Sequence, residues 1–163
     1  MNPFLMGLLP LRRYADFRGR STRTELIMFW ILTSMFGFGV NVLSGVAGLP
    51  DRAAASLIWL ALLCPTIALW VRRLHDSGRV GWWLLLLLPG AAITLRREYL
   101  LWQNPFDSAN AFLPGYIEVP VILLALPILF LLLRDDQGGP NAFGPNPRYP
   151  DDLELQDRTG EPA

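Results

Sequence analysis

Charged side chains are absent from long stretches of this chain, and these stretches predict its membrane-spanning elements. Residues 26–50 and residues 53–71 contain no charged residue, and only Asp51 and Arg52 separate the two runs. A helix of about 20 residues crosses the hydrocarbon core of a bilayer, so each run is long enough to span it. The short interruption leaves room only for a tight turn. We therefore expect an antiparallel pair of transmembrane helices.

Two shorter apolar runs follow and predict a third and a fourth span that are short or kinked. Residues 80–95 are uncharged but reach only about 24 Å as an α-helix, and a Pro-Gly pair interrupts them. Residues 119–133 are nearly all Leu, Ile, Val and Pro, and extending this run back to Phe112 includes Glu118. The pattern predicts an all-α, polytopic transmembrane bundle of about four spans, with three spans as the alternative.

The ends of the chain are more polar and divide it into three parts. Residues 1–25 form an N-terminal segment expected in the cytoplasm or at the membrane surface, residues 26–133 the transmembrane domain, and residues 134–163 a cytoplasmic tail. Within the domain, turn-forming pairs and aromatic side chains make residues 96–118 a predicted interfacial loop. The tail is first rich in Gly and Pro and then acidic, and we expect its end to be disordered.

Composition narrows the class of protein further. Hydrophobic residues make up 52% of the 163 residues and charged residues 17%, whereas roughly a quarter of a soluble domain is charged. The formal net charge is zero, which argues against a strongly basic nucleic-acid binder. One Cys and one His exclude a disulfide scaffold and a conventional zinc site built by this chain alone.

The basic residues predict the orientation in the membrane. All 14 are Arg, and with four spans eleven of them fall on one side. These eleven are Arg12, Arg13, Arg18, Arg20, Arg23, Arg72, Arg73, Arg79, Arg134, Arg148 and Arg158. Since cytoplasmic loops carry the excess of basic residues, both termini are expected in the cytoplasm. With three spans the N-terminus stays cytoplasmic and the tail moves outside.

The first polar motif, Phe17 to Glu25, lies directly before the first expected span. Thr22 and Glu25 have the spacing of a capping box, in which the Thr side chain accepts a hydrogen bond from the Glu backbone N–H. The motif therefore predicts the start of the first helix at the cytoplasmic surface. Arg20, Arg23 and Glu25 are also candidates for binding a ligand or a lipid headgroup, with the arginines suited to a lipid phosphate or another anion.

The second motif, residues 72–83, lies between the second and third expected spans. Its Asp-Ser-Gly sequence is typical of a turn. The one histidine, His75, is a candidate proton-transfer group, but no nucleophile motif or metal partner accompanies it, and a structural hydrogen bond is the simpler interpretation. The candidate binding residues of this motif are Arg72, Arg73, His75, Asp76 and Arg79.

The third motif is a run rich in Gly, Pro and Asn, residues 138–147. It lacks the Lys-Ser/Thr pair and the following helix of a phosphate-binding P-loop, and its prolines favour a fixed, turn-rich strap. We expect this strap to fold back on the arginines, with Asp135 and Asp136 near Arg72 or Arg20.

The order of these motifs carries a resemblance to a known family. The residues concerned are Phe17, Gly19, Arg20, Arg23 and Glu25; Arg72 to Asp76, Arg79, Trp82 and Trp83; and Gly139 to Asn141 with Phe143 to Pro147. Together they resemble the small bacterial inner-membrane proteins known as domain of unknown function 805, the YhaH-like proteins. Ala142 stands where similar proteins have Arg, and residues 91–118 look like an insertion. The resemblance implies an inner-membrane location and a scaffold but no reaction.

These observations predict a non-catalytic integral protein of the bacterial inner membrane, with no cofactor, catalytic residue or metal site. We expect its cytoplasmic Arg, His and Asp groups to organise the bundle and to bind anionic lipid or a partner. The expected partners are membrane lipids, a second copy of the chain or another membrane protein, and not nucleic acid. One alternative is a small transporter or channel subunit, which predicts a polar cavity between helices. A less favoured one, a lipid-headgroup enzyme, predicts a single concave site formed by Glu25, Arg72, Arg73, His75 and Asp76.

Overall fold

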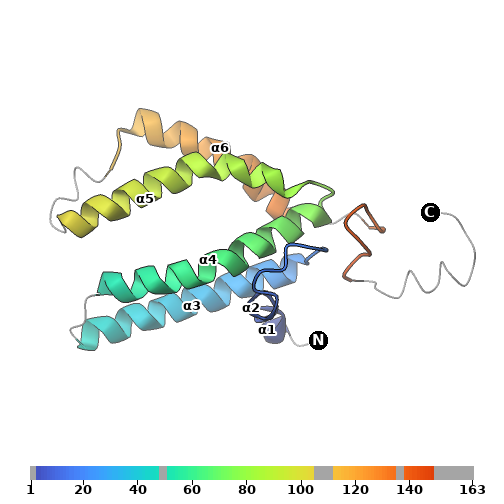
Figure 1. Ribbon diagram of the computed structural model, residues 1–163, viewed down its shortest axis with the longest axis horizontal. Coiled ribbons are helices and arrows are strands. Elements are labelled where there is room, and N and C mark those ends of the chain that lie inside the picture. Colours follow the sequence, from blue (N-terminus) through green and yellow to red (C-terminus); the bar gives the residue numbers. More distant parts are fainter. Residues whose placement is uncertain (1–2, 48–50, 105–111, 135–137, 149–163) are drawn as a thin grey trace, which may run out of the picture. The chain divides into compact units, whose positions relative to one another are not determined.

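All regular secondary structure in the described residues is helical, which confirms the predicted fold class. The computed structural model describes residues 3–47, 51–104, 112–134 and 138–148. The helices are α1 (Pro3–Met6), α2 (Leu9–Arg12), α3 (Arg23–Ala47), α4 (Asp51–Asp76), the 3₁₀ helix η1 (Gly81–Leu87), α5 (Leu88–Gln103) and α6 (Gly115–Leu133) (Figure 1). The chain divides into two compact units, residues 1–81 with 135–163 and residues 82–134, and each is described by itself.

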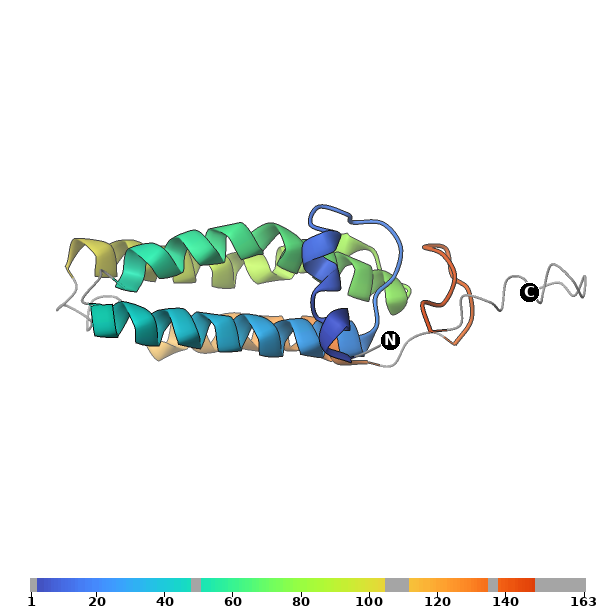
Figure 2. The ribbon, with the colours of Figure 1, turned by 90° about the horizontal axis from the view of Figure 1, so that it is seen from below.

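The first unit is built on α3 and α4, which correspond to the two long uncharged runs and lie side by side (Figures 1 and 2). Thr22 caps α3, because its Oγ1 accepts the backbone N–H of Glu25 at 3.2 Å. This is the bond that the capping-box spacing predicts. The cap places the start of α3 within the first polar motif, at the end of the pair where α4 finishes.

A glycine turn ends α4. Gly78 adopts a φ of 70°, and its backbone N–H donates to the His75 carbonyl at 3.0 Å, while the N–H of Arg79 donates to the Leu74 carbonyl at 2.8 Å. These two bonds form a Schellman motif, which requires a left-handed residue that only glycine adopts at little cost. The predicted Asp-Ser-Gly turn therefore stops α4 with its last carbonyls satisfied.

The buried apolar side chains of this unit lie where α3 begins and α4 ends. They include Leu26, Phe29, Ala68, Leu69 and Leu74, each at most 1% exposed. Toward the other end of the pair the large apolar side chains lie on the surface, as Phe38 does at 73% and Val46 at 85% exposure. Soluble proteins rarely expose a surface of this kind, whereas lipid tails are as apolar as the side chains they cover.

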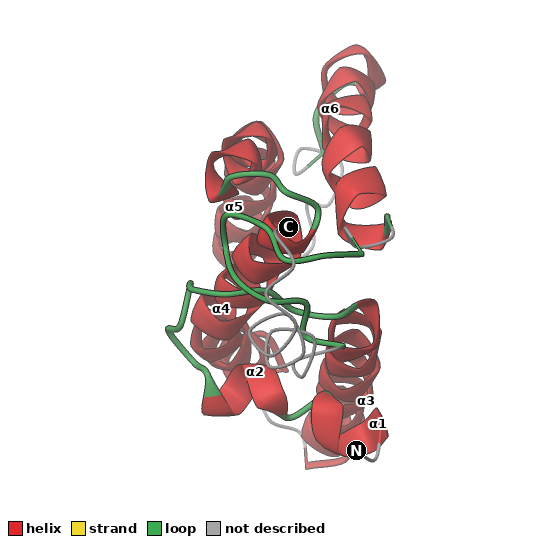
Figure 3. Ribbon diagram, turned by 90° about the vertical axis from the view of Figure 1, so that its right-hand side faces the viewer, coloured by secondary structure: helices red, strands yellow, loops and turns green. Residues whose placement is uncertain are grey.

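The N-terminal helices α1 and α2 lie against α3 and α4 near the packed end (Figure 1). The close contact depends on Gly7, where an added Cβ would lie 2.5 Å from Leu32 Cδ1 and 2.9 Å from the Met28 carbonyl group. The loop from α2 to α3 then passes the end of α4 (Figure 3). There the backbone N–H of Ser21 donates to the Arg72 carbonyl at 3.3 Å.

The second unit differs from the sequence prediction in its first half. Residues 81–87 form a 3₁₀ helix, and α5 begins at Leu88 with Pro89 in its first turn. Proline is well suited to the first turn because its missing N–H has no partner to lose there. The Pro-Gly pair therefore starts a helix instead of ending one, and residues 96–103 of the predicted loop belong to α5.

The second half of this unit, α6, begins at Gly115, between the two starts considered from the sequence. Glu118 lies in its first turn, and its Oε1 accepts the backbone N–H of Leu113 at 2.9 Å. This bond gives the carboxylate a local role at the helix start. By length and apolar composition, three described helices can cross a membrane: Arg23–Ala47, Ser56–Asp76 and Gly115–Leu133.

Candidate functional site

A group of buried charged side chains lies at the packed end of the α3–α4 pair. Its members are Arg20, Glu25, Arg72, Arg73 and Asp76, each at most 5% exposed, and we call them the arginine–carboxylate cluster. Charged residues are almost never fully buried unless they are paired. The partners of these five side chains therefore determine what the cluster does.

Asp76 lies between two arginines. Its Oδ1 accepts a hydrogen bond from Arg20 Nε at 2.8 Å, and its Oδ2 accepts one from Arg73 Nη1. All three side chains are at most 1% exposed. Hydrogen bonds between two charged groups are roughly twice as strong as neutral ones. This carboxylate thus joins the loop before α3 to the last turn of α4.

The same two arginines also donate to main-chain carbonyls. Arg20 Nη1 donates to the carbonyl of Gly139 at 2.7 Å and to that of Gly144 at 3.4 Å. Arg73 Nη1 donates to the Ser21 carbonyl at 3.4 Å. Through Arg20 the cluster reaches residues 138–148, which we call the tail strap.

Arg72 holds the other side of the cluster. Its Nη2 lies 3.3 Å from Glu25 Oε1, which is in the first turn of α3. Its Nη1 donates to the Asp16 carbonyl at 2.5 Å and to the Arg13 carbonyl at 3.3 Å. One guanidinium therefore connects α4 to α3 and to the loop that precedes α3.

His75, in the last turn of α4, contacts both the loop before α3 and the tail strap. Its Nδ1 lies 3.1 Å from the Gly19 carbonyl, and because a carbonyl only accepts hydrogen bonds, Nδ1 carries the proton in this arrangement. Its ring stacks on Phe143, with centroids 4.0 Å apart and planes 3° apart. The backbone carbonyl of His75 also accepts a bond from Asn141 Nδ2 at 2.9 Å.

The tail strap is shaped by its own asparagines and by one glycine. The backbones of Asn141 and Gly144 bond to each other in both directions, at 3.1 and 3.0 Å, and Asn141 Oδ1 accepts the N–H of Phe143 at 2.9 Å. Asn146, which is 3% exposed, donates to the Gly138 carbonyl at 3.4 Å. These bonds turn the strap so that its carbonyls face Arg20 and its Phe143 faces His75.

The structure brings six of the eight candidate residues together: Arg20, Glu25, Arg72, Arg73, His75 and Asp76. Arg23 lies half-buried at the first position of α3, and Arg79 is exposed beyond the end of α4. The strap does fold back on an arginine, as expected, through Arg20. The predicted partners Asp135 and Asp136 lie outside the described residues.

Main-chain acceptors are the part of the site that sequence reasoning missed. The carbonyls of Arg13, Asp16, Gly139 and Gly144 bind the buried guanidinium groups, and no residue type marks a carbonyl in a sequence. The third motif contains Phe143, but its spacing did not predict a contact with His75. An aromatic residue two positions after an Asn, in a strap with no other aromatic or large apolar side chain, was the available signal.

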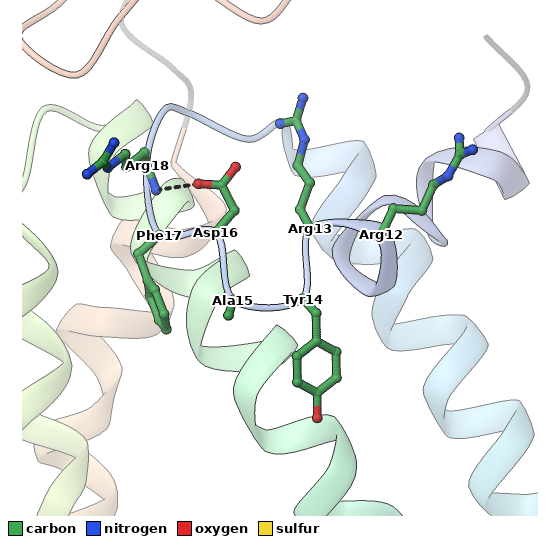
Figure 4. Close-up of a pocket in the computed structure, with 7 residues that line it drawn as sticks. All are labelled: Arg12, Arg13, Tyr14, Ala15, Asp16, Phe17 and Arg18. Carbon is green, nitrogen blue, oxygen red and sulfur yellow. Dashed lines mark hydrogen bonds between the residues drawn. The ribbon is translucent and has the colours of Figure 1, made fainter.

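The loop from residue 12 to residue 18 forms an open hollow of about 600 Å³ beside the cluster (Figure 4). It is lined by Arg12, Arg13, Tyr14, Ala15, Asp16, Phe17 and Arg18. The six clustered candidates are not among these lining residues, because their polar groups are directed at one another and at carbonyls. Among the residues that the structure describes, no three His, Cys, Asp or Glu side chains are grouped to hold a metal ion.

Comparisons with known proteins agree with the helical membrane fold. The chain is 40% identical to the inner membrane protein YhaI of Escherichia coli (strain K12) over 76 residues, which are 47% of this chain and 64% of YhaI. It therefore spans less than two thirds of that relative. It is 40% identical to the uncharacterized protein YiiR of the same strain over 113 residues, 66% of this chain and 73% of YiiR.

A third relative is the inner membrane protein YhaH of the same strain, 33% identical over 82 residues, 48% of this chain and 68% of YhaH. No solved structure matches the chain. The family described as protein of unknown function (DUF805) matches residues 14–145, which include both helices of the pair, the cluster and most of the tail strap. The chain therefore belongs to the DUF805 family.

Proposed function

We propose that this chain is a non-catalytic, multi-pass protein of the bacterial inner membrane whose arginine–carboxylate cluster fastens its helices together on the cytoplasmic side. Relatives named as inner membrane proteins and three helices that are long and apolar enough to cross a membrane support the location. The role of the cluster is argued from its contacts.

The bonds of Asp76 and Arg20 carry the proposal. Asp76 binds Arg20 and Arg73, and Arg20 continues to two carbonyls of the tail strap. These few side chains connect the loop before α3, the last turn of α4 and the strap. The charged groups of these side chains are directed mainly at one another and at main-chain carbonyls, an arrangement that favours holding the fold together over binding a substrate.

The distribution of arginines supports the orientation. The cluster contains three of the arginines that are expected on the cytoplasmic side, and Arg12, Arg13 and Arg18 lie in the loop next to it. Basic residues close to the ends of spans stay in the cytoplasm. We therefore place the N-terminus and the cluster on that side of the membrane.

The alternative of a lipid-headgroup enzyme requires the same side chains to face an accessible site. Glu25, Arg72 and Asp76 converge as that alternative predicts, but they are at most 5% exposed. His75 donates its Nδ1 proton to a carbonyl and lies flat against Phe143. This geometry favours fastening over proton transfer.

Replacing Asp76 tests the proposal. Asp76→Asn leaves Arg20 and Arg73 buried without their carboxylate, and removing one partner of a buried ion pair costs about 3–5 kcal/mol. We expect a clear loss of thermal stability of the purified protein in detergent, together with faster protease cleavage in the tail strap. Glu98→Gln on α5 is the matched control, since Glu98 is exposed and surface changes usually stay within about 0.5 kcal/mol.

A double substitution distinguishes loss of the Arg20–Asp76 contact from a general effect of introducing Asn at position 76. Arg20→Gln with Asp76→Asn should cost less than the sum of the two single changes, because the charges depend on each other. Wild-type stability and an equally protected strap in Asp76→Asn would contradict the proposal. Strict additivity of the two changes would also count against the Arg20–Asp76 contact.

A further inference from the structure

We propose that the loop of residues 12–18, which we call the arginine loop, binds the phosphate of an anionic phospholipid at the membrane surface. The site lies beside the arginine–carboxylate cluster and uses different arginines. It therefore goes beyond the fastening function, and it is tested by measurements that do not depend on that function.

Charge distinguishes this loop from the cluster. Arg12, Arg13 and Arg18 are exposed, and among the described residues no carboxylate forms an ion pair with their side chains. Arg20, Arg72 and Arg73, in contrast, are buried and bonded to Asp76, Glu25 and carbonyls. These three guanidinium groups, which form no ion pair with a described carboxylate, thus line the hollow of about 600 Å³.

The loop contains one negative charge, and that carboxylate has a structural role. Asp16 Oδ1 accepts the backbone N–H of Arg18 at 3.1 Å, and the Asp16 carbonyl accepts a bond from Arg72. Asp16 therefore shapes the turn between Arg13 and Arg18. Three arginines against one aspartate leave the loop positively charged, which is complementary to a lipid phosphate.

The loop is held in place on α4 before any ligand binds. Arg72 donates to the carbonyls of Arg13 and Asp16, Cys64 Sγ lies 3.4 Å from the Tyr14 carbonyl, and the Tyr14 hydroxyl donates to the Ala61 carbonyl. A binding loop that is already ordered loses less conformational entropy when the ligand arrives. This anchoring distinguishes the loop from a flexible basic tail.

The two sides of the loop suit the boundary of a bilayer. Arg12 and Arg13 point to one side, and Tyr14 and Phe17 point to the other, along the helices (Figure 4). Aromatic side chains favour the headgroup region. The preceding segment, α1 and α2 with the turn between them, exposes apolar side chains at Phe4, Leu5, Leu8 and Leu11. Segments with an apolar face and arginines on the other lie in the membrane surface and prefer anionic lipid.

The test uses the purified full-length chain in detergent with equal amounts of phosphatidylglycerol and phosphatidylcholine, and native mass spectrometry counts the bound lipids. The variant Arg12→Gln/Arg13→Gln/Arg18→Gln is compared with the control Arg96→Gln/Arg97→Gln/Arg148→Gln, which loses the same charge elsewhere. Each arginine near an anionic surface contributes about a fivefold change in binding. We expect the loop variant to lose its preference for phosphatidylglycerol by about 100-fold and the control to retain it.

Several outcomes would overturn the site. Equal loss in the loop variant and in the control would show a general charge effect, and unchanged binding in the loop variant would show that lipid binds elsewhere. Binding of inorganic phosphate that competes with phosphatidylglycerol would indicate a site for a soluble anion. If the triple variant does not purify, the three single Gln variants are measured, each with an expected fivefold loss. The thermal stability of these variants is recorded alongside, so that loss of fastening is distinguished from loss of lipid.

Discussion

Gly144 controls the shape of the tail strap. Its φ is 129°, a backbone conformation that residues with a Cβ rarely adopt, and its carbonyl and N–H both take part in the turn with Asn141. The same carbonyl accepts a bond from Arg20. A single backbone angle therefore positions an acceptor of the cluster.

Gly144→Ala is expected to loosen the strap, with a cost of about 1–3 kcal/mol from the strained backbone. Space does not limit this substitution, since an added Cβ meets nothing within 4 Å. Gly139→Ala is the control, because its Cβ is equally free and its φ lies outside the positive region. Faster protease cleavage in the strap of the first variant, and not of the second, is the expected result. Equal cleavage in both would mean that the angle is unimportant.

At the same scale, some ion pairs of the cluster can be predicted from the sequence and others cannot. Arg73 and Asp76 are three positions apart on one helix, so their contact follows from helical spacing alone. Arg20 and Asp76 are 56 residues apart, and their contact depends on how the loop before α3 crosses the end of α4. The candidate residues could be selected from their charge and motif, but their mutual neutralisation could not.

At the scale of elements, the fit of α1 against α3 depends on Gly7. We expect Gly7→Ala to destabilise the protein by about 1–3 kcal/mol, because the added methyl group overlaps with Leu32 and with the backbone of Met28. Gly37→Ala in α3 is the control. It meets open space and should be neutral or stabilising, since Gly in a helix interior costs about 0.5–1 kcal/mol relative to Ala. Thermal unfolding in detergent compares the two, and a more stable Gly7→Ala variant would contradict this packing.

Apolar runs predicted the helices well where the chain has one uninterrupted run per span. They failed between residues 81 and 103, because a Pro-Gly pair is compatible with the end of one helix or the start of another. The structure combines seven 3₁₀ residues, about 14 Å long, with sixteen α-helical residues, about 24 Å long. Together they exceed the roughly 30 Å of a bilayer core, although α5 alone does not.

At the scale of the whole molecule, the contacts of Arg20 constrain the topology. The loop before α3 bonds to the tail strap, so we expect both to lie on the same side of the membrane, with an even number of crossings between them. The three apolar helices α3, α4 and α6 make an odd number. We therefore expect η1 with α5 to be the fourth crossing.

Topology reporters test this count. A green fluorescent protein fused to the C-terminus should fluoresce, and alkaline phosphatase at the same position should be inactive, as expected for a cytoplasmic tail. A cysteine introduced at Gln103 in a Cys64→Ala background should react with a membrane-impermeant thiol reagent added outside the membrane, because α5 ends there. An active phosphatase fusion would contradict the four crossings and the contact between loop and strap.

The contact between Arg20 and the tail strap also has a consequence for the order of folding. Arg20 and the carbonyl of Gly139 are 119 residues apart, so a ribosome completes all of the helices that the structure describes before this acceptor exists. Until then the early half of the cluster lacks some of its bonds, and a truncated or incompletely inserted chain retains that defect. The strap can thus bind Arg20 only at a late step of biogenesis. This contact distinguishes fully synthesised and inserted chains from truncated or incompletely inserted ones.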